Sequence, residues 1–188
     1  SMDFHADGLP ITPAGLEYAR TTLGADLAGI WTVLAVETGG FGFLPDRRPK
    51  VLFERHIFHY VTKGRFDATH PDISNATPGG YIGGAGEYDR ILSAVKLDYE
   101  SALDSASWGI GQILGFNSDR AGYDLVDDLV ADMIHSEDNQ LRAMAKFIAS
   151  AGFKATGKFK PTTAPDSISS SNGGRTCPLG SSAQWFPS

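Results

Sequence analysis

The feature that most constrains this chain is an apolar helical repeat that ends at paired glycines. Its apolar residues follow the three- and four-residue spacing of one helix face, and they are Leu27, Ile30, Trp31 and Leu34. The repeat stops at Glu37-Thr38-Gly39-Gly40, and paired glycines end helices because they leave helical geometry at little steric cost. We therefore expect a helix over residues 26–37 that carries a carboxylate at its C-terminal end.

Similar patterns predict further helices separated by loops. These helices are expected over residues 13–22, 54–61, 87–103, 107–114, 125–135 and 136–151. A short strand is expected over residues 50–53, and residues 64–86, rich in Gly, Pro, Asp and Asn, are expected to form a long functional loop. The predicted fold class is therefore mainly α: a helical bundle domain with a small strand element.

The composition fits one globular domain followed by a segment of different character. The chain has 188 residues, of which 41% are apolar and 20% charged, which is enough to build a core. After Gly152 the sequence is dominated by Ser, Thr, Gly and Pro and loses its apolar periodicity. We expect a folded domain over residues 1–152 and an irregular or partly disordered tail over residues 153–188.

Charge and hydropathy exclude several classes of partner. The formal net charge is −6, so the basic excess typical of nucleic-acid binding is absent. No run approaches the roughly 20 apolar residues that span a bilayer, and we expect no membrane insertion. The first residues, SMDFHADGLP, lack the basic and apolar regions of a signal peptide, which predicts synthesis in the cytoplasm. A single cysteine, Cys177, rules out an internal disulfide.

Glu37 is the residue of this pattern best suited to acid catalysis. Burial against apolar neighbours and the negative end of a helix dipole both favour the protonated form of a carboxyl group at this position. A protonated carboxylic acid is what cleavage of a glycosidic bond requires. The alternative interpretation is a solvated glutamate at a helix end.

A second motif, SASWGIGQILGFN, covers residues 105–117. Gly109 and Gly111 allow a ligand or another backbone to approach closely. Gln112 offers an amide to a sugar hydroxyl or N-acetyl group, and Trp108 offers a flat face on which a sugar ring can pack. The alternative is a glycine-rich helix in the core with Trp108 buried.

Together these motifs resemble a known family. A glutamate at a helix end followed by Gly-Gly-Phe, with a later Gly-x-x-Gln-Ile segment, looks like the lysozyme-like muramidases and lytic transglycosylases. More narrowly, three segments in order resemble the N-acetylmuramidase domain of phage endolysins and related wall-degrading proteins: ETGGFGFLPDRRPKVLFERHIFH, HPDISNATPGGYIGGAGEYDRI and SASWGIGQILGFN. The resemblance covers roughly residues 10–152 and implies an α+β lysozyme-like catalytic domain with the strand element beside the cleft.

The resemblance implies hydrolysis of the β-1,4 bond between N-acetylmuramic acid and N-acetylglucosamine, with Glu37 as the general acid. Glu54 is the best match for a second functional carboxylate, and Asp72 is the runner-up. The alternative for Glu54 is a structural salt bridge to a nearby arginine, namely Arg47, Arg48 or Arg55. The alternative for Asp72 is a turn residue, which its Pro-Asp-x-Ser-Asn context favours.

We expect the three segments to line the substrate cleft. The predicted substrate-binding residues are Phe43, Tyr81, Ser107, Trp108, Gly109, Gln112 and Asn117. The alternative interpretation is that Tyr81 belongs to a flexible loop that is glycine-rich but forms no part of the cleft wall. Relatives continue with a Tyr-Asn-Gly element near the cleft, which has no counterpart here, because the last tyrosine is Tyr123.

No metal or organic cofactor is expected. His56 and His59 can share a helix face, but no His-Glu-x-x-His or Cys/His cluster accompanies them. The expected partner is bacterial peptidoglycan, on which a monomer acts after release or delivery to the cell wall. Two rival functions remain open: a lytic transglycosylase that leaves anhydro sugars, and a catalytically impaired glycan-binding module.

Overall fold

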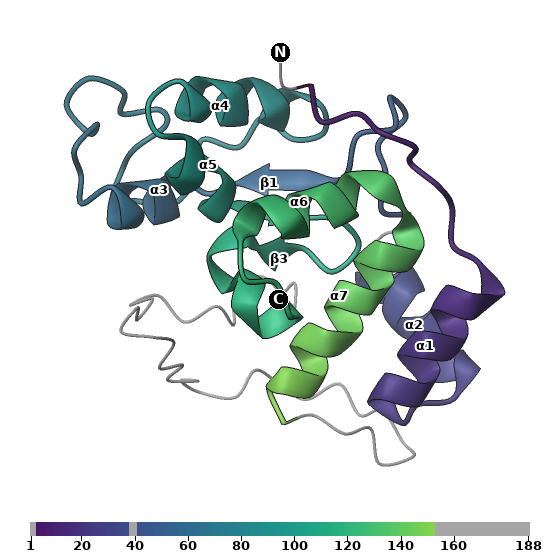
Figure 1. The fold of residues 1–188 in the computed structure, drawn as a ribbon. Coiled ribbons are helices and arrows are strands. Elements are labelled where there is room, and N and C mark those ends of the chain that lie inside the picture. Colours follow the sequence, from purple (N-terminus) through teal and green to yellow (C-terminus); the bar gives the residue numbers. More distant parts are fainter. Residues whose placement is uncertain (1–2, 38–40, 153–188) are drawn as a thin grey trace.

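Helices dominate the computed structural model of this chain, which describes residues 3–37 and 41–152 (Figure 1). The helices are α1 (Pro13–Leu23), α2 (Leu27–Glu37), α3 (Arg55–Val61), α4 (Gly86–Val95), α5 (Tyr99–Asp104), the 3-10 helix η1 (Gly115–Ala121), α6 (Val126–His135) and α7 (Glu137–Ser150). The strands are β1 (Val51–Phe53), β2 (Ala106–Trp108) and β3 (Ile113–Leu114). The predicted fold class, mainly helical with a small strand element, is confirmed. The division into residues 1–152 and 153–188 stays a prediction, because the tail lies outside the described residues.

The strand element is a three-stranded antiparallel sheet in the order β1-β2-β3. Trp108 pairs with Val51 on one side and with Ile113 on the other. The helix predicted over residues 107–114 is therefore wrong, since this segment forms a β-hairpin. Gly109 and Gln112 adopt φ angles of 68° and 45° in its turn, which a continuous α-helix excludes. All residues from 106 to 111 are buried, so the apolar pattern cannot distinguish a buried strand from a buried helix.

The helix predicted over residues 87–103 is interrupted. It forms α4 and α5, because Asp98 adopts extended backbone angles and its side chain accepts a hydrogen bond from the Ser101 N–H. The other predicted elements are confirmed within a residue or two at each end. Among the described residues, 64–85 carry no helix or strand, as expected for the long loop.

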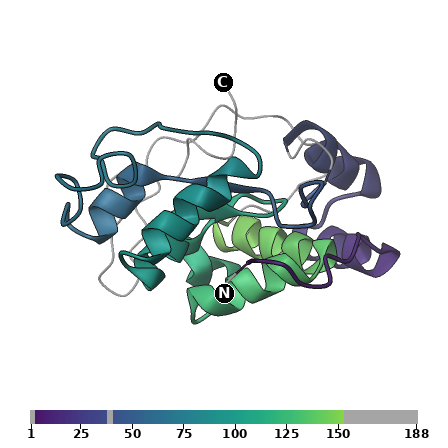
Figure 2. The same cartoon turned by 90° about the horizontal axis from the view of Figure 1, so that it is seen from above.

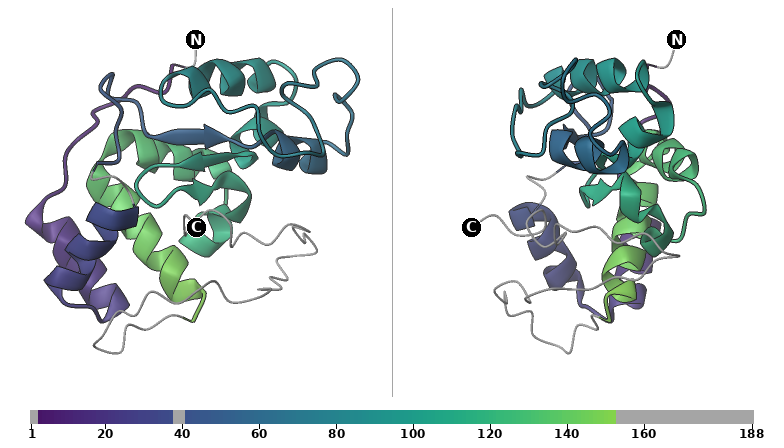
Figure 3. Two further views of the ribbon diagram at one scale, coloured as in Figure 1. Left: turned by 180° about the vertical axis from the view of Figure 1, so that it is seen from behind. Right: turned by 90° about the vertical axis from the view of Figure 1, so that its left-hand side faces the viewer.

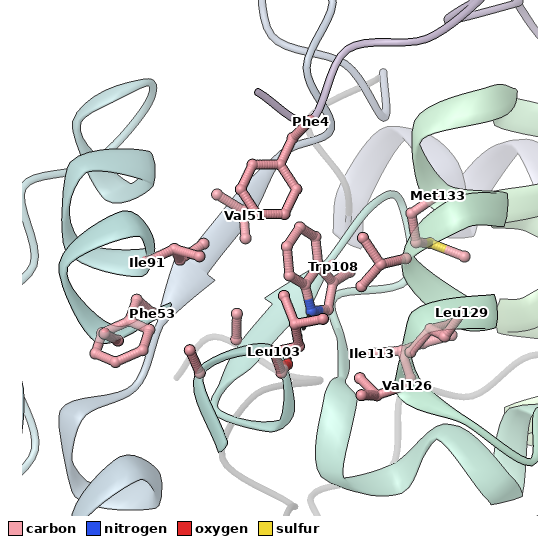
Figure 4. Close-up of a cluster of buried hydrophobic side chains, with 14 of the residues drawn as sticks. Phe4, Val51, Phe53, Ile91, Leu103, Trp108, Ile113, Val126, Leu129 and Met133 are labelled. Atoms are coloured by element: carbon pink, nitrogen blue, oxygen red, sulfur yellow. Dashed lines mark hydrogen bonds between the residues drawn. The ribbon is translucent and has the colours of Figure 1, made fainter. Parts of the chain in front are cut away.

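The larger of two apolar cores surrounds the sheet (Figure 4). Trp108 lies at its centre, and Phe4 of the N-terminal segment packs between the rings of Tyr88 and Trp108 with centroid separations of 5.2 and 5.5 Å. In Figure 1 this N-terminal segment crosses from the side of α4 to α1. The N-terminal segment therefore completes the core of a sheet that lies far along the sequence.

The second core joins α1, α2 and α7 through residues such as Ala19, Ile30 and Leu141. Viewed from above and from the side, α2 and the loop that precedes α4 lie on the same side of the molecule, the rear in Figure 1 (Figures 2 and 3). The helix that ends at Glu37 and the glycine-rich loop therefore lie on one side of the molecule.

Candidate active site

Glu54 lies where β1 passes into α3. Its backbone N–H donates to the Ser105 carbonyl at 2.8 Å, and its own carbonyl accepts from the N–H groups of Ile57 and Phe58, which starts the helix. Only 3% of Glu54 is exposed. A carboxylate is rarely buried to this extent without specific polar partners.

Two of those partners meet one carboxylate oxygen of Glu54. The Tyr81 hydroxyl donates to Oε2 at 2.6 Å, and Nδ1 of His56 lies 3.3 Å from the same oxygen. The His56 contact lacks hydrogen-bond geometry, since Nδ1 is buried without a hydrogen bond among the described residues. Glu54 therefore lies between a tyrosine from the long loop and a histidine from α3.

The arginines expected as ion-pair partners of Glu54 make other contacts. Arg48 binds Asp46 at 2.6 Å, the Arg55 side chain donates to the carbonyls of the loop residues 77 and 78, and Arg47 stacks on Phe43 at 4.8 Å. The salt-bridge interpretation of Glu54 is not supported by these contacts.

A buried ion pair on α4 connects Glu54 to the long loop. Arg90 Nη1 lies 2.9 Å from Glu87 Oε2, and both side chains bind the backbone of Phe53, the residue before Glu54. Burial alone would raise the pKa of Glu87, but N–H groups from the loop and Phe53, together with Arg90, outweigh it and lower that pKa. Glu87 is therefore held as an ionised carboxylate inside the protein.

Glu37 is the last residue of α2. Its side chain and residues 38–40 lie outside what the structure describes, so its role as the acid stays a prediction. The segment that follows is fixed by α7, since Gly42 N–H donates to Glu137 Oε1 at 2.8 Å. A Cβ on Gly42 would lie 1.8 Å from Gln140 Oε1, so only glycine fits this approach to α7.

The turn between β2 and β3 contacts the segment before β1 and the helices α6 and α7. Gln112 Nε2 donates to the Gly109 carbonyl at 3.0 Å and to the Lys50 carbonyl at 3.4 Å, which ties the turn to the segment before β1. A Cβ on Gly109 would lie 2.8 Å from Met133 Sδ and 2.9 Å from Gln140 Cδ. The groups that lie close to Gly109 are therefore side chains of α6 and α7, whereas the sequence predicted a ligand or another backbone.

The prediction that Trp108 offers a face to a sugar ring is wrong. The residue has no exposed surface, and its ring nitrogen donates to the Leu103 carbonyl at 3.2 Å inside the larger core (Figure 4). The alternative, a buried core tryptophan, is the correct one. Strand β2 is covered on both faces, which a single apolar run does not reveal.

Other predicted substrate-binding residues differ in their exposure. Phe43, Ser107 and Asn117 are buried, with 6%, 1% and 4% exposed, so none of the three is proposed to bind substrate through its side chain. Tyr81 is 47% exposed and remains the best-placed candidate. Asp72 is exposed in a turn, and its carbonyl accepts from Arg90 at 3.4 Å.

Neither a metal centre nor a membrane span is found in the described part of the chain. Within residues 3–37 and 41–152 no group of three His, Cys, Asp or Glu side chains could hold a metal ion. None of the helices described there is long and apolar enough to cross a bilayer.

Four residues of this site were not predicted from the sequence: His56 as a neighbour of Glu54, the pair Glu87 and Arg90, and Glu137. A signal for the pair was present, because Glu87 and Arg90 are charged residues next to the apolar face formed by Tyr88 and Ile91. A charged pair three residues apart on a core-facing helix indicates a buried ion pair.

Two comparisons with known proteins find relatives of this chain. The family model of the muramidase family, described as N-acetylmuramidase, matches residues 26–159. The crystal structure of the Burkholderia AP3 phage endolysin overlays with a TM-score of 0.71 at 38% identity, covering 80% of this chain and 56% of that chain. The chain thus spans little more than half the length of that endolysin. No curated protein matches it significantly.

The family match covers well over half of the chain and includes both α2 and the site around Glu54. The helical domain with its three-stranded sheet has the lysozyme-like fold of the endolysin. On these grounds the chain belongs to the N-acetylmuramidase family of peptidoglycan-degrading enzymes.

Proposed function

We propose that this chain is a muramidase that hydrolyses the β-1,4 bond between N-acetylmuramic acid and N-acetylglucosamine in bacterial peptidoglycan. The observation that carries the proposal is the buried carboxylate of Glu54, which is 3% exposed and hydrogen-bonded to the half-exposed Tyr81 in a member of the N-acetylmuramidase family. Burying a carboxylate costs folding free energy, so a buried carboxylate next to an exposed loop residue indicates a catalytic role.

Two carboxyl groups divide the chemistry in this proposal. Glu37 protonates the oxygen of the leaving sugar, as the general acid. Glu54, ionised, directs a water molecule or stabilises the positive charge that develops on the sugar ring. Tyr81 presents the exposed part of its ring to the glycan. Asp72, exposed in its turn, has no part in the reaction.

The test is turnover of purified peptidoglycan by the wild type and by Glu37→Gln and Glu54→Gln. Loss of a positioned acid or base lowers rates by about 100- to 10,000-fold, so both variants should release almost no soluble glycan while keeping a wild-type circular dichroism spectrum. Glu17→Gln is the matched control, since Glu17 pairs with Arg20 at the exposed surface of α1. A Glu37→Gln variant that clears a peptidoglycan suspension at the wild-type rate contradicts the assignment.

Product analysis separates the proposed reaction from its rivals. A muramidase leaves N-acetylmuramic acid at a reducing end that borohydride converts to the alcohol, as mass spectrometry detects. A lytic transglycosylase leaves an anhydro end that is lighter by one water and resists borohydride. Tight binding to insoluble peptidoglycan without any soluble product would instead support a non-catalytic module.

A further inference from the structure

We propose that Tyr81 is a positioning residue for Glu54, and that the buried Glu87–Arg90 pair holds Tyr81 against it. This inference rests on the proposed function of Glu54. It assigns to Tyr81 a role that is separate from contact with the glycan: its hydroxyl fixes the orientation of the carboxylate and favours its ionised form.

The contact itself has the geometry of a strong hydrogen bond. The Tyr81 hydroxyl lies 2.6 Å from Glu54 Oε2, within the range of bonds to an ionised oxygen. Burial and the adjacent Glu54 carboxylate raise the pKa of Tyr81 above its ordinary value of 10.0. The phenol therefore stays protonated and remains a donor to Glu54 across the neutral range.

The loop that carries Tyr81 is bound by the same ion pair that binds β1. Glu87 Oε1 accepts from the N–H groups of Ile82 and Gly83 at 2.6 and 2.9 Å. Arg90 Nη2 donates to the Gly79 carbonyl at 3.3 Å. Backbone groups on both sides of Tyr81 are thus fixed by one buried pair.

The Glu87–Arg90 pair also binds Phe53, the residue before Glu54. Glu87 Oε2 accepts from the Phe53 N–H at 3.0 Å, and Arg90 Nη1 donates to the Phe53 carbonyl at 2.8 Å. Because neighbours of Tyr81 and of Glu54 bind the same two side chains, the distance between the phenol and the carboxylate is set by a rigid, buried connection. A glycine-rich loop alone would leave this distance undefined.

Other charged or titratable groups lie close to Glu54 or to Tyr81. His56 approaches Oε2 from α3 at 3.3 Å. Arg90 and Glu87, both on α4, lie near Tyr81, and the Arg90 guanidinium is 5.9 Å from the Tyr81 ring centroid. Each of these groups is retained in Tyr81→Phe, so that variant removes one donor and leaves the remaining electrostatics in place.

The first test is the pH dependence of glycan release by Tyr81→Phe. Removing a donor to the ionised carboxylate disfavours that form, so the acidic limb of the kcat profile should move to higher pH by about one to two units. At a pH on that limb kcat should fall by about 10- to 100-fold, the usual effect of a lost bond to a charged group, while KM changes little. A role confined to sugar contact would raise KM and leave the limb in place.

The matched control is Tyr99→Phe. Tyr99 also donates its hydroxyl to an aspartate, Asp127 on α6, and is similarly exposed at 38%, but it lies on α5, outside the proposed site. Its pH profile should coincide with that of the wild type. A Tyr81→Phe variant with wild-type kcat and an unmoved acidic limb overturns the inference.

A second measurement does not depend on activity. Protein labelled with 13C at the glutamate carboxyl is titrated by NMR, and the Glu54 resonance is identified by its absence in Glu54→Gln. The Glu54 titration should move to higher pH in Tyr81→Phe relative to the wild type. If it does not move, the inference fails; if it moves but the wild type releases no glycan, the proposed function fails instead.

Discussion

Glu137 at the start of α7 accepts a hydrogen bond from the backbone N–H of Gly42 at 2.8 Å, across 95 positions of the sequence. Its other oxygen accepts from the Ile11 N–H at 3.1 Å. One buried carboxylate therefore joins the N-terminal segment, the segment that follows the Glu37 helix, and α7. The backbone at Gly42 is therefore held by a contact that only the folded chain creates.

Glu137→Gln should weaken both stability and turnover. A glutamine keeps one acceptor but turns an N–H donor toward one of two backbone N–H groups, which leaves a buried group unpaired at a cost of about 1–3 kcal/mol. Urea unfolding measures the change, and the control Glu17→Gln, at an exposed position on α1, should leave the unfolding midpoint close to that of the wild type. Equal unfolding midpoints for Glu137→Gln and wild type would contradict this role.

Glu87→Gln should lower the free energy of unfolding in a pH-dependent way. Removing one partner of a buried pair costs about 3–5 kcal/mol. The folded-state pKa of Glu87 lies below the ordinary value of 4.5, so its contribution is complete above that value and is lost as pH falls through the folded pKa.

The comparison is urea unfolding of wild type and Glu87→Gln at neutral pH and in acid. The difference between the two should be largest at pH 7 and should shrink in acid. Asp128→Asn, which changes an exposed carboxylate in the first turn of α6, should cost less than about 1 kcal/mol. A gap that widens as pH falls would have the wrong sign for a depressed pKa.

Trp108→Phe should destabilise the fold without weakening substrate binding. The smaller ring leaves a cavity beside Phe4 and removes the bond from the indole nitrogen to the Leu103 carbonyl, for a loss of about 2–4 kcal/mol. Thermal unfolding measures the loss, and KM at a temperature where the variant is folded should equal that of the wild type. A large rise in KM at unchanged stability would restore the sugar-stacking interpretation.

Asp72→Asn should separate the two candidates for the second carboxylate. Asp72 is exposed in a turn, whereas Glu54 is buried beside Tyr81. The asparagine variant should therefore retain nearly full turnover of peptidoglycan. Removal of a catalytic acid or base would instead lower turnover by about 100-fold or more. A comparable loss in Asp72→Asn and Glu54→Gln would reopen the choice.

The sequence by itself determined the elements whose signals are local. Helical spacing and its stop signals predicted α1, α2, α6 and α7 to within a residue or two, because periodicity and capping act over a few neighbouring residues. The same motifs indicated the N-acetylmuramidase family, which the comparison confirmed. They also selected Glu37 and Glu54, whose roles stay predictions.

Only the tertiary structure decided which side chains surround Glu54. Tyr81 meets it across 27 positions, and Glu87 meets Phe53 across 34. No local pattern encodes such pairings, because they depend on how α4 and the long loop pack against β1. The same reason explains the buried hairpin at Trp108. An apolar run indicates that a segment is buried, but whether the segment forms a helix or a strand depends on the elements that pack around it.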